Sequence, residues 1–279
     1  MLTLLAIGLL LAGCGGGDDG QATVELNGEA IEVLTYRPDC EPRGLMFVFH
    51  GNGRDAGYYR DAARDVADRA CLALFVPRFD KERFPAWRYQ MAGVSRAREI
   101  QPRATWTASL ALRLVAWARE RDDLDGAPVY LVGHSAGGQF LSRLAAYLDV
   151  PRAGRLVVMS PGSHVLPSFA ERAPYGLAGL EGEANARQRL RAYLAQPLTI
   201  YIGDRDTGRR GINSSKAGGR QGDNRLERAR YAYQTALRMA DKHGLTCNWT
   251  LVEAKGVGHS GKDMMAAPEV WDALGLPAP

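Results

Sequence analysis

The chain is 279 residues long and 46% hydrophobic, which is ample for one sizeable core and fits either one α/β domain or two small domains. Its net charge of +4 is small for this length, and the basic residues are spread along the chain rather than gathered in a block. This distribution argues against a nucleic-acid-binding protein, so we expect no nucleic-acid partner.

The first 14 residues, MLTLLAIGLLLAGC, form an apolar segment. It is too short to span a bilayer as a mature helix and matches the hydrophobic part of a secretory signal, although no positive residue precedes it. Residues 11–14, LAGC, resemble the bacterial lipobox. The resemblance implies a lipoprotein signal peptide over residues 1–14 and a lipid on Cys14, and a plain secretory signal is the alternative.

A lipid anchor would attach the protein to a membrane, so we expect an exported lipoprotein of the cell envelope. Gly15 follows the cysteine. By resemblance to lipoprotein sorting patterns, this implies the outer membrane or periplasm if the cell has two membranes. Residues 15–21 are rich in glycine and aspartate and predict a flexible tether. Residues 22–279 are then expected to form a single domain.

Residues 22–36 alternate in polarity on both sides of Asn27-Gly28, which predicts an antiparallel hairpin at the edge of a sheet. Continuous apolar runs predict strands that are buried on both faces, at residues 44–50, 71–77, 129–132, 155–159, 198–202 and 247–253. Helical spacing is found at residues 58–70, 140–148, 181–194, 226–243 and 260–274. This alternation predicts a mostly parallel sheet with helices on both faces, whose strand carboxyl ends share one edge.

The segment Gly133-His134-Ser135-Ala136-Gly137 lies between a predicted strand and a predicted helix, and it fits the pattern G-x-S-x-G. A nucleophilic serine in this pattern needs a sharp turn that exposes its hydroxyl, and the two glycines leave room for the backbones to pass. The turn directs the Ala136 amide toward a developing oxyanion. The alternative is a serine in an ordinary strand-to-helix turn.

A nucleophilic serine needs a base, and an imidazole base needs a group that holds its tautomer. Residues 198–206, LTIYIGDRD, and residues 248–259, NWTLVEAKGVGH, each deliver a titratable residue just after an apolar run. The candidates are Asp204 or Asp206 for the acid and His259 for the base. The chain order Ser, Asp, His is that of the fold which uses this serine turn.

With these motifs the chain resembles the α/β-hydrolase superfamily over most of its length after about residue 22. The likeness is carried by GHSAG, GDRDT, GVGHS and the segment HGNG at residues 50–53. It implies a sheet of about eight strands with the antiparallel N-terminal hairpin and a small cap insertion at residues 163–196. It implies Asp206, three residues after Gly203, as the acid, and the amide of Asn52, alone or together with that of Gly53, as an oxyanion donor beside Ala136.

The resemblance implies a serine esterase in which Ser135, Asp206 and His259 cleave a small or polymeric carboxylic ester through an acyl-enzyme. The narrower likeness is to feruloyl esterases, polyhydroxyalkanoate depolymerases and dienelactone-hydrolase relatives. One alternative is an amide or peptide hydrolase of the prolyl-oligopeptidase type, and another is a non-catalytic lipoprotein that serves as a binding module. We expect a monomer without a cofactor. We also expect no metal site, because the cysteines lack metal-ligand spacing.

The superfamily topology brings the end of the second strand near the start of the fourth, which implies a disulfide between Cys40 and Cys71 and leaves Cys247 as a free thiol. Tyr58 and Trp87 are candidates for the substrate pocket. Residues 207–224 are rich in glycine, serine and arginine and predict a mobile loop near the acid. Its cations could meet an anionic substrate or lipid head group; a solvated loop is the alternative. They are Arg209, Arg210, Lys216 and Arg220.

Overall fold

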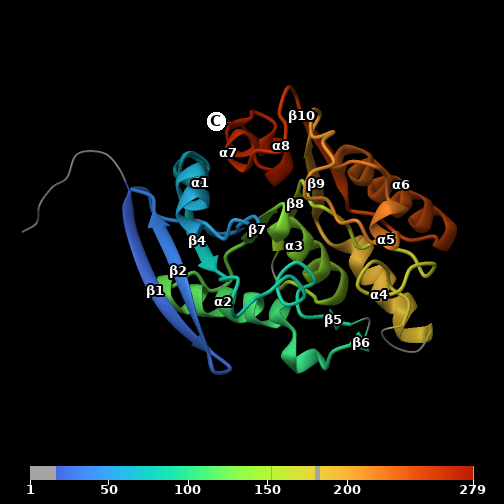
Figure 1. Cartoon of the computed structure of the whole chain (residues 1–279). Helices are drawn as coiled ribbons and strands as arrows, with labels where there is room; N and C mark the ends of the chain where they lie inside the picture. Colours follow the sequence, from blue (N-terminus) through green and yellow to red (C-terminus); the bar gives the residue numbers. More distant parts are fainter. Residues whose placement is uncertain (1–16, 98, 152, 180–182, 279) are drawn as a thin grey trace, which may run out of the picture.

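The computed structural model describes residues 17–278 except 98, 152 and 180–182. Its centre is an eight-stranded sheet in the order β1-β2-β4-β3-β7-β8-β9-β10 (Figure 1). The strands from β4 to β10 pair in parallel, and β2 is antiparallel to both β1 and β4. The predicted mostly parallel sheet with an antiparallel N-terminal hairpin is therefore confirmed. The signal peptide and Cys14 lie outside the described residues.

The hairpin turns at Asn27 and Gly28, whose positive φ angles of 54° and 78° fit a tight turn between twisted strands. The turn sets the register of β1 (Asp18–Leu26) and β2 (Glu29–Arg37), which stay paired as far as Asp18 and Arg37. Residues 18–21 of the expected tether are consequently part of the edge strand. The pairing extends this far because every residue of β2, from Glu29 to Arg37, has a partner in β1.

The remaining strands of the large sheet are β3 (Gly44–Phe49), β4 (Leu72–Arg78), β7 (Val129–His134), β8 (Ala153–Met159), β9 (Leu198–Gly203) and β10 (Thr250–Ala254). From β3 the chain passes to β4 on one side, whereas β7 pairs with β3 on the other side. This reversal is a topological switch point. In parallel sheets, ligands bind in the crevice outside the strand carboxyl ends at such a point. The loops after β3 and β7 therefore meet where a site is expected.

Two apolar cores cover the sheet. The first lies under α2 (Thr107–Asp122), α3 (Ala136–Tyr147), α4 (Glu183–Ala195) and α6 (Arg225–His243). The second lies under α1 (Ala56–Ala70), α7 (Gly261–Ala266) and α8 (Val270–Leu274). Strand β3 supplies Phe47 and Phe49 to the first core and Met46 and Val48 to the second, because alternate side chains point to opposite faces. Helices on both faces are thus confirmed.

Three short elements lie in the connections: β5 (Ser95–Arg96) pairs with β6 (Glu99–Ile100), and α5 (Lys216–Gly219) interrupts the loop after β9. The prediction of one closing helix over residues 260–274 is wrong, because α7 ends before Pro268 and α8 starts after it. The residue before a proline is disfavoured in the helical region, and Ala267 has a ψ of 140°. In the part of the chain that is described, no helix is both long and apolar enough to cross a bilayer.

Cys40 and Cys71 form a disulfide with a Cα–Cα distance of 5.9 Å. Cys40 follows β2, and Cys71 ends α1 just before β4 with a left-handed φ of 51°. Among the described residues, Cys247 is a free thiol of intermediate exposure. Disulfides persist in oxidising compartments, so the pair is compatible with an exported protein.

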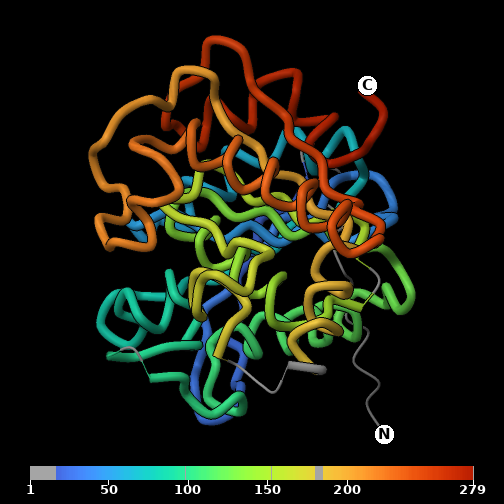
Figure 2. The backbone as a smooth tube through the Cα atoms, turned by 90° about the vertical axis from the view of Figure 1, so that its right-hand side faces the viewer, coloured from blue at the N-terminus to red at the C-terminus, as the bar shows by residue number. Residues whose placement is uncertain are grey.

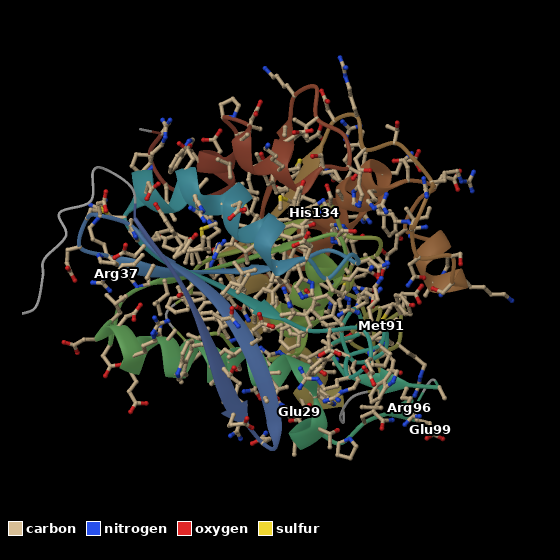
Figure 3. All side chains as sticks on the ribbon, turned by 60° about the vertical axis from the view of Figure 1, so that its left-hand side comes forward. Glu29, Arg37, Met91, Arg96, Glu99 and His134 are labelled. Carbon is tan, nitrogen blue, oxygen red and sulfur yellow. A yellow bond between two sulfur atoms is a disulfide. The ribbon has the colours of Figure 1, made fainter. Side chains whose placement is uncertain are left out.

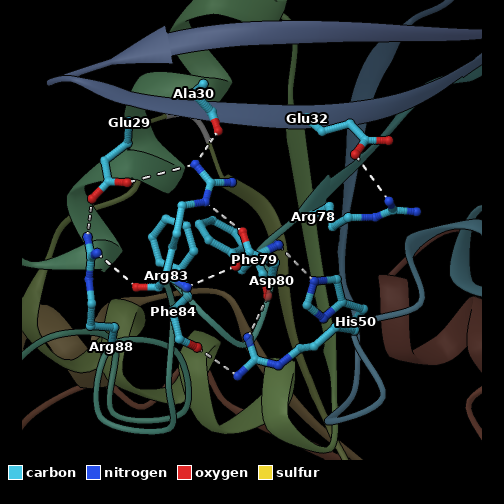
Figure 4. Close-up of polar contacts among 11 residues, drawn as sticks. Glu29, Ala30, Glu32, His50, Arg78, Phe79, Asp80, Arg83, Phe84 and Arg88 are labelled. Carbon is cyan, nitrogen blue, oxygen red and sulfur yellow. Dashed lines mark hydrogen bonds and ion pairs between the residues drawn. The ribbon is translucent and has the colours of Figure 1, made fainter.

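The segment after β4 is tied to the N-terminal hairpin and to the loop after β3 (Figure 4). Arg83 donates to the Ala30 carbonyl at 2.7 Å, and Arg88 donates to Glu29 at 2.6 Å. The Phe79 amide donates to His50 Nε2 at 3.0 Å. In Figure 2 this segment (teal) and the loop after β9 (orange) lie on the same side of the molecule. Both loops can therefore contribute residues at the carboxyl edge of the sheet, where Ser135 lies.

Candidate active site

Ser135 stands in the sharp turn between β7 and α3, with a φ of 55° and a ψ of −107°. A positive φ is uncommon for a residue other than glycine and stores strain at this turn. The flanking glycines are sterically required, because a Cβ on Gly133 would collide with the Gly137 carbonyl and a Cβ on Gly137 would collide with the Phe49 carbonyl. The turn thus needs glycine at both positions and presents the Ser135 hydroxyl at the carboxyl edge of the sheet.

Three residues from distant loops form one hydrogen-bonded chain. His259 Nε2 lies 3.0 Å from Ser135 Oγ, and His259 Nδ1 lies 2.8 Å from Asp206 Oδ2. Ser135 follows β7, Asp206 follows β9, and His259 follows β10. With Nδ1 donating to the carboxylate, Nε2 is left as an acceptor for the serine hydroxyl proton. The structure therefore brings together the three residues that the sequence singles out.

The two candidate acids have different partners. Asp204 accepts a hydrogen bond from the Gly256 amide at 2.8 Å and so holds the turn after β10. Asp206 bonds His259 and is only 2% exposed. The choice of Asp206 from the spacing after Gly203 agrees with this geometry.

A buried arginine on α6 binds the other oxygen of Asp206. Arg225 Nη1 lies 3.5 Å from Asp206 Oδ1, and Arg225 Nη2 donates to the Arg210 carbonyl at 3.0 Å. Burial lowers the pKa of Arg225, and the charge of Asp206 opposes this shift. Arg225 thus compensates the buried carboxylate and connects it to the loop after β9. The sequence reasoning missed this residue, although a cation in the first turn of a helix opposes the helix dipole and signals an acidic partner.

Two backbone amides face the reacting edge. Ala136 is the first residue of α3, so its N–H has no carbonyl acceptor within the helix. Asn52 follows Gly51, whose carbonyl accepts from the Arg54 amide at 3.1 Å and lies 3.1 Å from His50 Nδ1. His50 Nε2 accepts from the Phe79 amide (Figure 4), so its Nδ1 carries the proton and donates to the Gly51 carbonyl. These bonds fix the Gly51–Asn52 peptide plane and hence the direction of the Asn52 amide.

His134, the second residue of the serine motif, lies inside the fold near α1 (Figure 3). Its Nδ1 is 2.6 Å from the Tyr59 hydroxyl, and its ring lies against the His259 ring with a centroid distance of 4.8 Å. Burial lowers the pKa of His134 well below its usual range, and the charge of a protonated His259 acts in the same direction. His134 is therefore a neutral support behind His259.

Three buried histidines predict a loss of stability in acid. Burial lowers the pKa of His50 to about 4 and that of His164 to about 3, and it also lowers the pKa of His134. Unfolded histidines titrate at about 6.5, so the unfolded state binds more protons below that pH. The free energy of unfolding should therefore fall as the pH drops from about 6.5 toward 4, by about 1.4 kcal/mol per pH unit for each histidine.

Urea denaturation of the wild type and of His164→Gln between pH 7 and pH 5 checks this expectation. The free energy of unfolding should depend less steeply on pH in the variant than in the wild type. The difference should correspond to about one proton fewer taken up on unfolding near pH 5. Equal slopes in the two proteins would mean that His164 takes up its proton over the same pH range in the folded and the unfolded protein, and would contradict the lowered pKa.

A cavity of about 540 Å³ adjoins Ser135. Most of the residues that line it have polar side chains: Asn52, Gln90, Ser135, Ala136, Gln139, Arg205, Asp206, Gly208, Arg210, Gly211, Arg225 and His259. Gln90, Gln139, Arg205 and Arg225 were not singled out from the sequence. Of the loop cations, Arg210 lines the cavity, whereas Arg209 pairs with Asp223 and Arg220 pairs with Glu171. The loop expected to be mobile is anchored by Arg228, which donates to the carbonyls of Gly222 and Asn213.

Neither of the two aromatic residues that the sequence suggests for the substrate pocket lines this cavity. Tyr58 does not line the cavity, and its hydroxyl accepts from the Lys262 amide of α7 at 3.0 Å. Trp87 does not line it either and lies under the guanidinium of Arg96. Gly53 is exposed beside the cavity and is not among its lining residues, so the geometry favours Asn52 as the donor. No described residue of the segment expected to form a cap, residues 163–196, lines this cavity.

The fold and the Ser–His–Asp arrangement are those of an α/β hydrolase. Poly(3-hydroxybutyrate) depolymerase LpqC from Bordetella parapertussis is 32% identical and has a TM-score of 0.83, with 95% of this chain and 92% of that chain covered. Poly(aspartic acid) hydrolase-1 from Sphingomonas sp. KT-1 is 27% identical and has a TM-score of 0.81, with 90% and 96% covered. The chain belongs to the α/β-hydrolase superfamily.

A lidless α/β serine hydrolase from Xanthomonas campestris shares the fold at 13% identity and a TM-score of 0.51, with 94% of this chain and 97% of that chain covered. No protein-family model and no curated protein matches the chain. The structural neighbours support hydrolase activity.

Proposed function

We propose that this protein is a serine hydrolase that cleaves carboxylic esters through an acyl-enzyme intermediate at Ser135. The observation that carries the proposal is the hydrogen-bonded chain from Ser135 through His259 to Asp206, with distances of 3.0 Å and 2.8 Å. A serine hydroxyl is a weak nucleophile until a neighbouring base removes its proton. This chain supplies the base and holds its tautomer.

In the first half-reaction, Ser135 Oγ attacks the ester carbonyl while His259 Nε2 takes the hydroxyl proton. Asp206 stabilises the imidazolium, and the amides of Ala136 and Asn52 donate to the oxyanion. His259 then gives the proton to the departing alcohol as the carbon–oxygen bond breaks. In the second half-reaction, water attacks the acyl-enzyme with His259 again as the base, and the acid is released.

A polymeric substrate is supported by two observations. Two neighbours above 25% identity are named for polymers, a poly(3-hydroxybutyrate) depolymerase and a poly(aspartic acid) hydrolase. In this chain, the cavity residues Asn52, Arg205, Gly208, Arg210 and Gly211 are exposed. An open cavity of this kind admits the middle of a long chain as well as a small ester.

We also propose that the protein is located in the cell envelope and carries a lipid anchor on Cys14. This location is supported by the lipobox-like residues 11–14 and by the Cys40–Cys71 disulfide, which is rare in reducing compartments. The substrate would then be met outside the cytoplasm.

A neutral fluorophosphonate and a series of p-nitrophenyl esters test the proposal. We expect the purified protein to be labelled at Ser135 and to hydrolyse the acetate ester, whereas Ser135→Ala should do neither. A matched p-nitroanilide measures amide cleavage, and a higher rate on that compound than on the ester would favour an amide hydrolase. A folded protein that is neither labelled nor active would be a binding module and would overturn the proposal.

A further inference from the structure

Few aliphatic or aromatic side chains line the cavity beside Ser135. Among the described lining residues, Ala136 is the only one with an aliphatic side chain, and three carry side-chain amides, Asn52, Gln90 and Gln139. Pockets that bind long acyl chains are lined mainly by hydrophobic and aromatic side chains. This cavity therefore fits a polar substrate better than an aliphatic one.

The charges in the cavity do not cancel. It contains three arginines and one carboxylate, that of Asp206. Arg225 and Asp206 compensate each other, since both are buried and lie 3.5 Å apart. Arg205 and Arg210 are exposed, and neither forms an ion pair with any carboxylate that the structure describes. Two cations thus remain for a ligand.

The backbones of these two cations are tied to the reacting group. The Arg205 amide donates to the Val257 carbonyl at 3.0 Å, two residues before His259. The Arg210 carbonyl accepts from Arg225, which also binds Asp206. The two guanidinium groups are therefore anchored beside the hydrogen-bonded chain, while their side chains keep the freedom to follow a ligand.

We infer that the substrate is anionic: it carries a carboxylate near the scissile bond, and Arg205 and Arg210 bind that carboxylate. The inference rests on the proposed function, because it names the substrate class of the same site. A guanidinium donates two parallel hydrogen bonds to a carboxylate, and such charge-assisted bonds are stronger than neutral ones. Arg205 and Arg210 are specificity-determining residues in this arrangement, and the reaction at Ser135 is unaltered.

The test compares two esters that share the scissile bond, the leaving group and the acyl chain. One is the mono-p-nitrophenyl ester of adipic acid, which ends in a carboxylate, and the other is its neutral methyl ester. We expect the wild type to show a kcat/KM at least about tenfold higher for the anionic ester, which is the effect of about 1.4 kcal/mol of extra binding. Added salt should reduce this ratio, because the pairs are partly exposed.

The readout for the variants is this same ratio of kcat/KM values, which a loss of folded protein does not change. Arg205→Gln and Arg210→Gln should each lower it several-fold, and the double variant should bring it to about one. Arg209→Gln is the matched control. It removes the same charge from the same loop, but Arg209 pairs with Asp223 and does not line the cavity, so the ratio should stay at the wild-type value.

A pair of fluorophosphonates, one with a terminal carboxylate and one without, gives the same comparison without turnover, because labelling needs only the attack by Ser135. Equal rates for both members of each pair in the wild type, with no effect of the arginine variants, would overturn the inference and leave the proposed function intact. If neither phosphonate labels Ser135 in the folded protein, the proposed function fails, and the substrate inference fails with it.

Discussion

Replacement of Ser135 by alanine is expected to lower kcat for ester hydrolysis by roughly 10⁴- to 10⁶-fold, the range seen when a nucleophile of this kind is removed. The oxyanion donors and the binding cavity remain, so a small residual rate should persist. Substrate affinity should change little, because the hydroxyl contributes mainly after binding. Single-turnover kinetics together with an independent measurement of substrate binding separate these effects.

The control for this variant is a pair of further substitutions. His259→Gln should cause a comparable loss, and the double variant Ser135→Ala with His259→Gln should be hardly slower than either single variant, since the two groups act as one unit. Circular dichroism should show the wild-type fold in all three proteins. Multiplicative losses in the double variant, or esterase activity retained by Ser135→Ala, would rule out the assigned roles.

Replacement of Arg225 by methionine is expected to lower the free energy of unfolding by about 3 to 5 kcal/mol, because it leaves the Asp206 carboxylate buried without its cation. The two side chains are only 4% and 1% exposed, so water cannot replace the lost partner. Activity should fall as well, since Arg225 also holds the loop after β9 through the Arg210 carbonyl. Urea denaturation and ester kinetics measure the two effects.

A double-mutant cycle shows whether the loss comes from the uncompensated charge. In Arg225→Met with Asp206→Asn, both charges are gone, and much of the lost stability should return while activity does not. Arg225→Lys keeps the charge but loses the fork that contacts two groups, so its stability should be intermediate. Equal stability of Arg225→Met and the double variant would show that the ion pair does not control stability here.

Local patterns were enough for most of the fold. The apolar run at residues 44–50 became β3 because its alternate side chains enter the two cores on either side of the sheet. Asn27-Gly28 gave a hairpin because these residues accept positive φ angles. Errors arose where local signals compete: Pro268 divides the predicted closing helix, and pairing with β2 extends β1 into the expected tether.

The candidate pocket was the part least open to prediction from sequence. Tyr58 and Trp87 are large aromatics in plausible segments, and they point to other partners, a backbone amide and an arginine. Phe84 and Tyr89 from the same segment as Trp87 are fully buried in the first core. Whether an aromatic side chain faces a cavity, the core or solvent depends on contacts from other elements, and spacing along one segment does not report those contacts.

The sequence by itself determined the serine turn, the strand-ending positions of the Asp204–Asp206 segment and of His259, and their order along the chain, because each follows from glycine sterics and local periodicity. The choice of Asp206 over Asp204 came from the family resemblance. Only the tertiary structure decided that Arg225 compensates Asp206 and that Arg205 and Arg210 border the cavity beside Ser135. His259 and Ser135 are 124 residues apart, and Arg225 and Asp206 are 19 apart. Partners at such separations are set by the crossover connections of the sheet and by which charges are buried together, and neither leaves a local pattern.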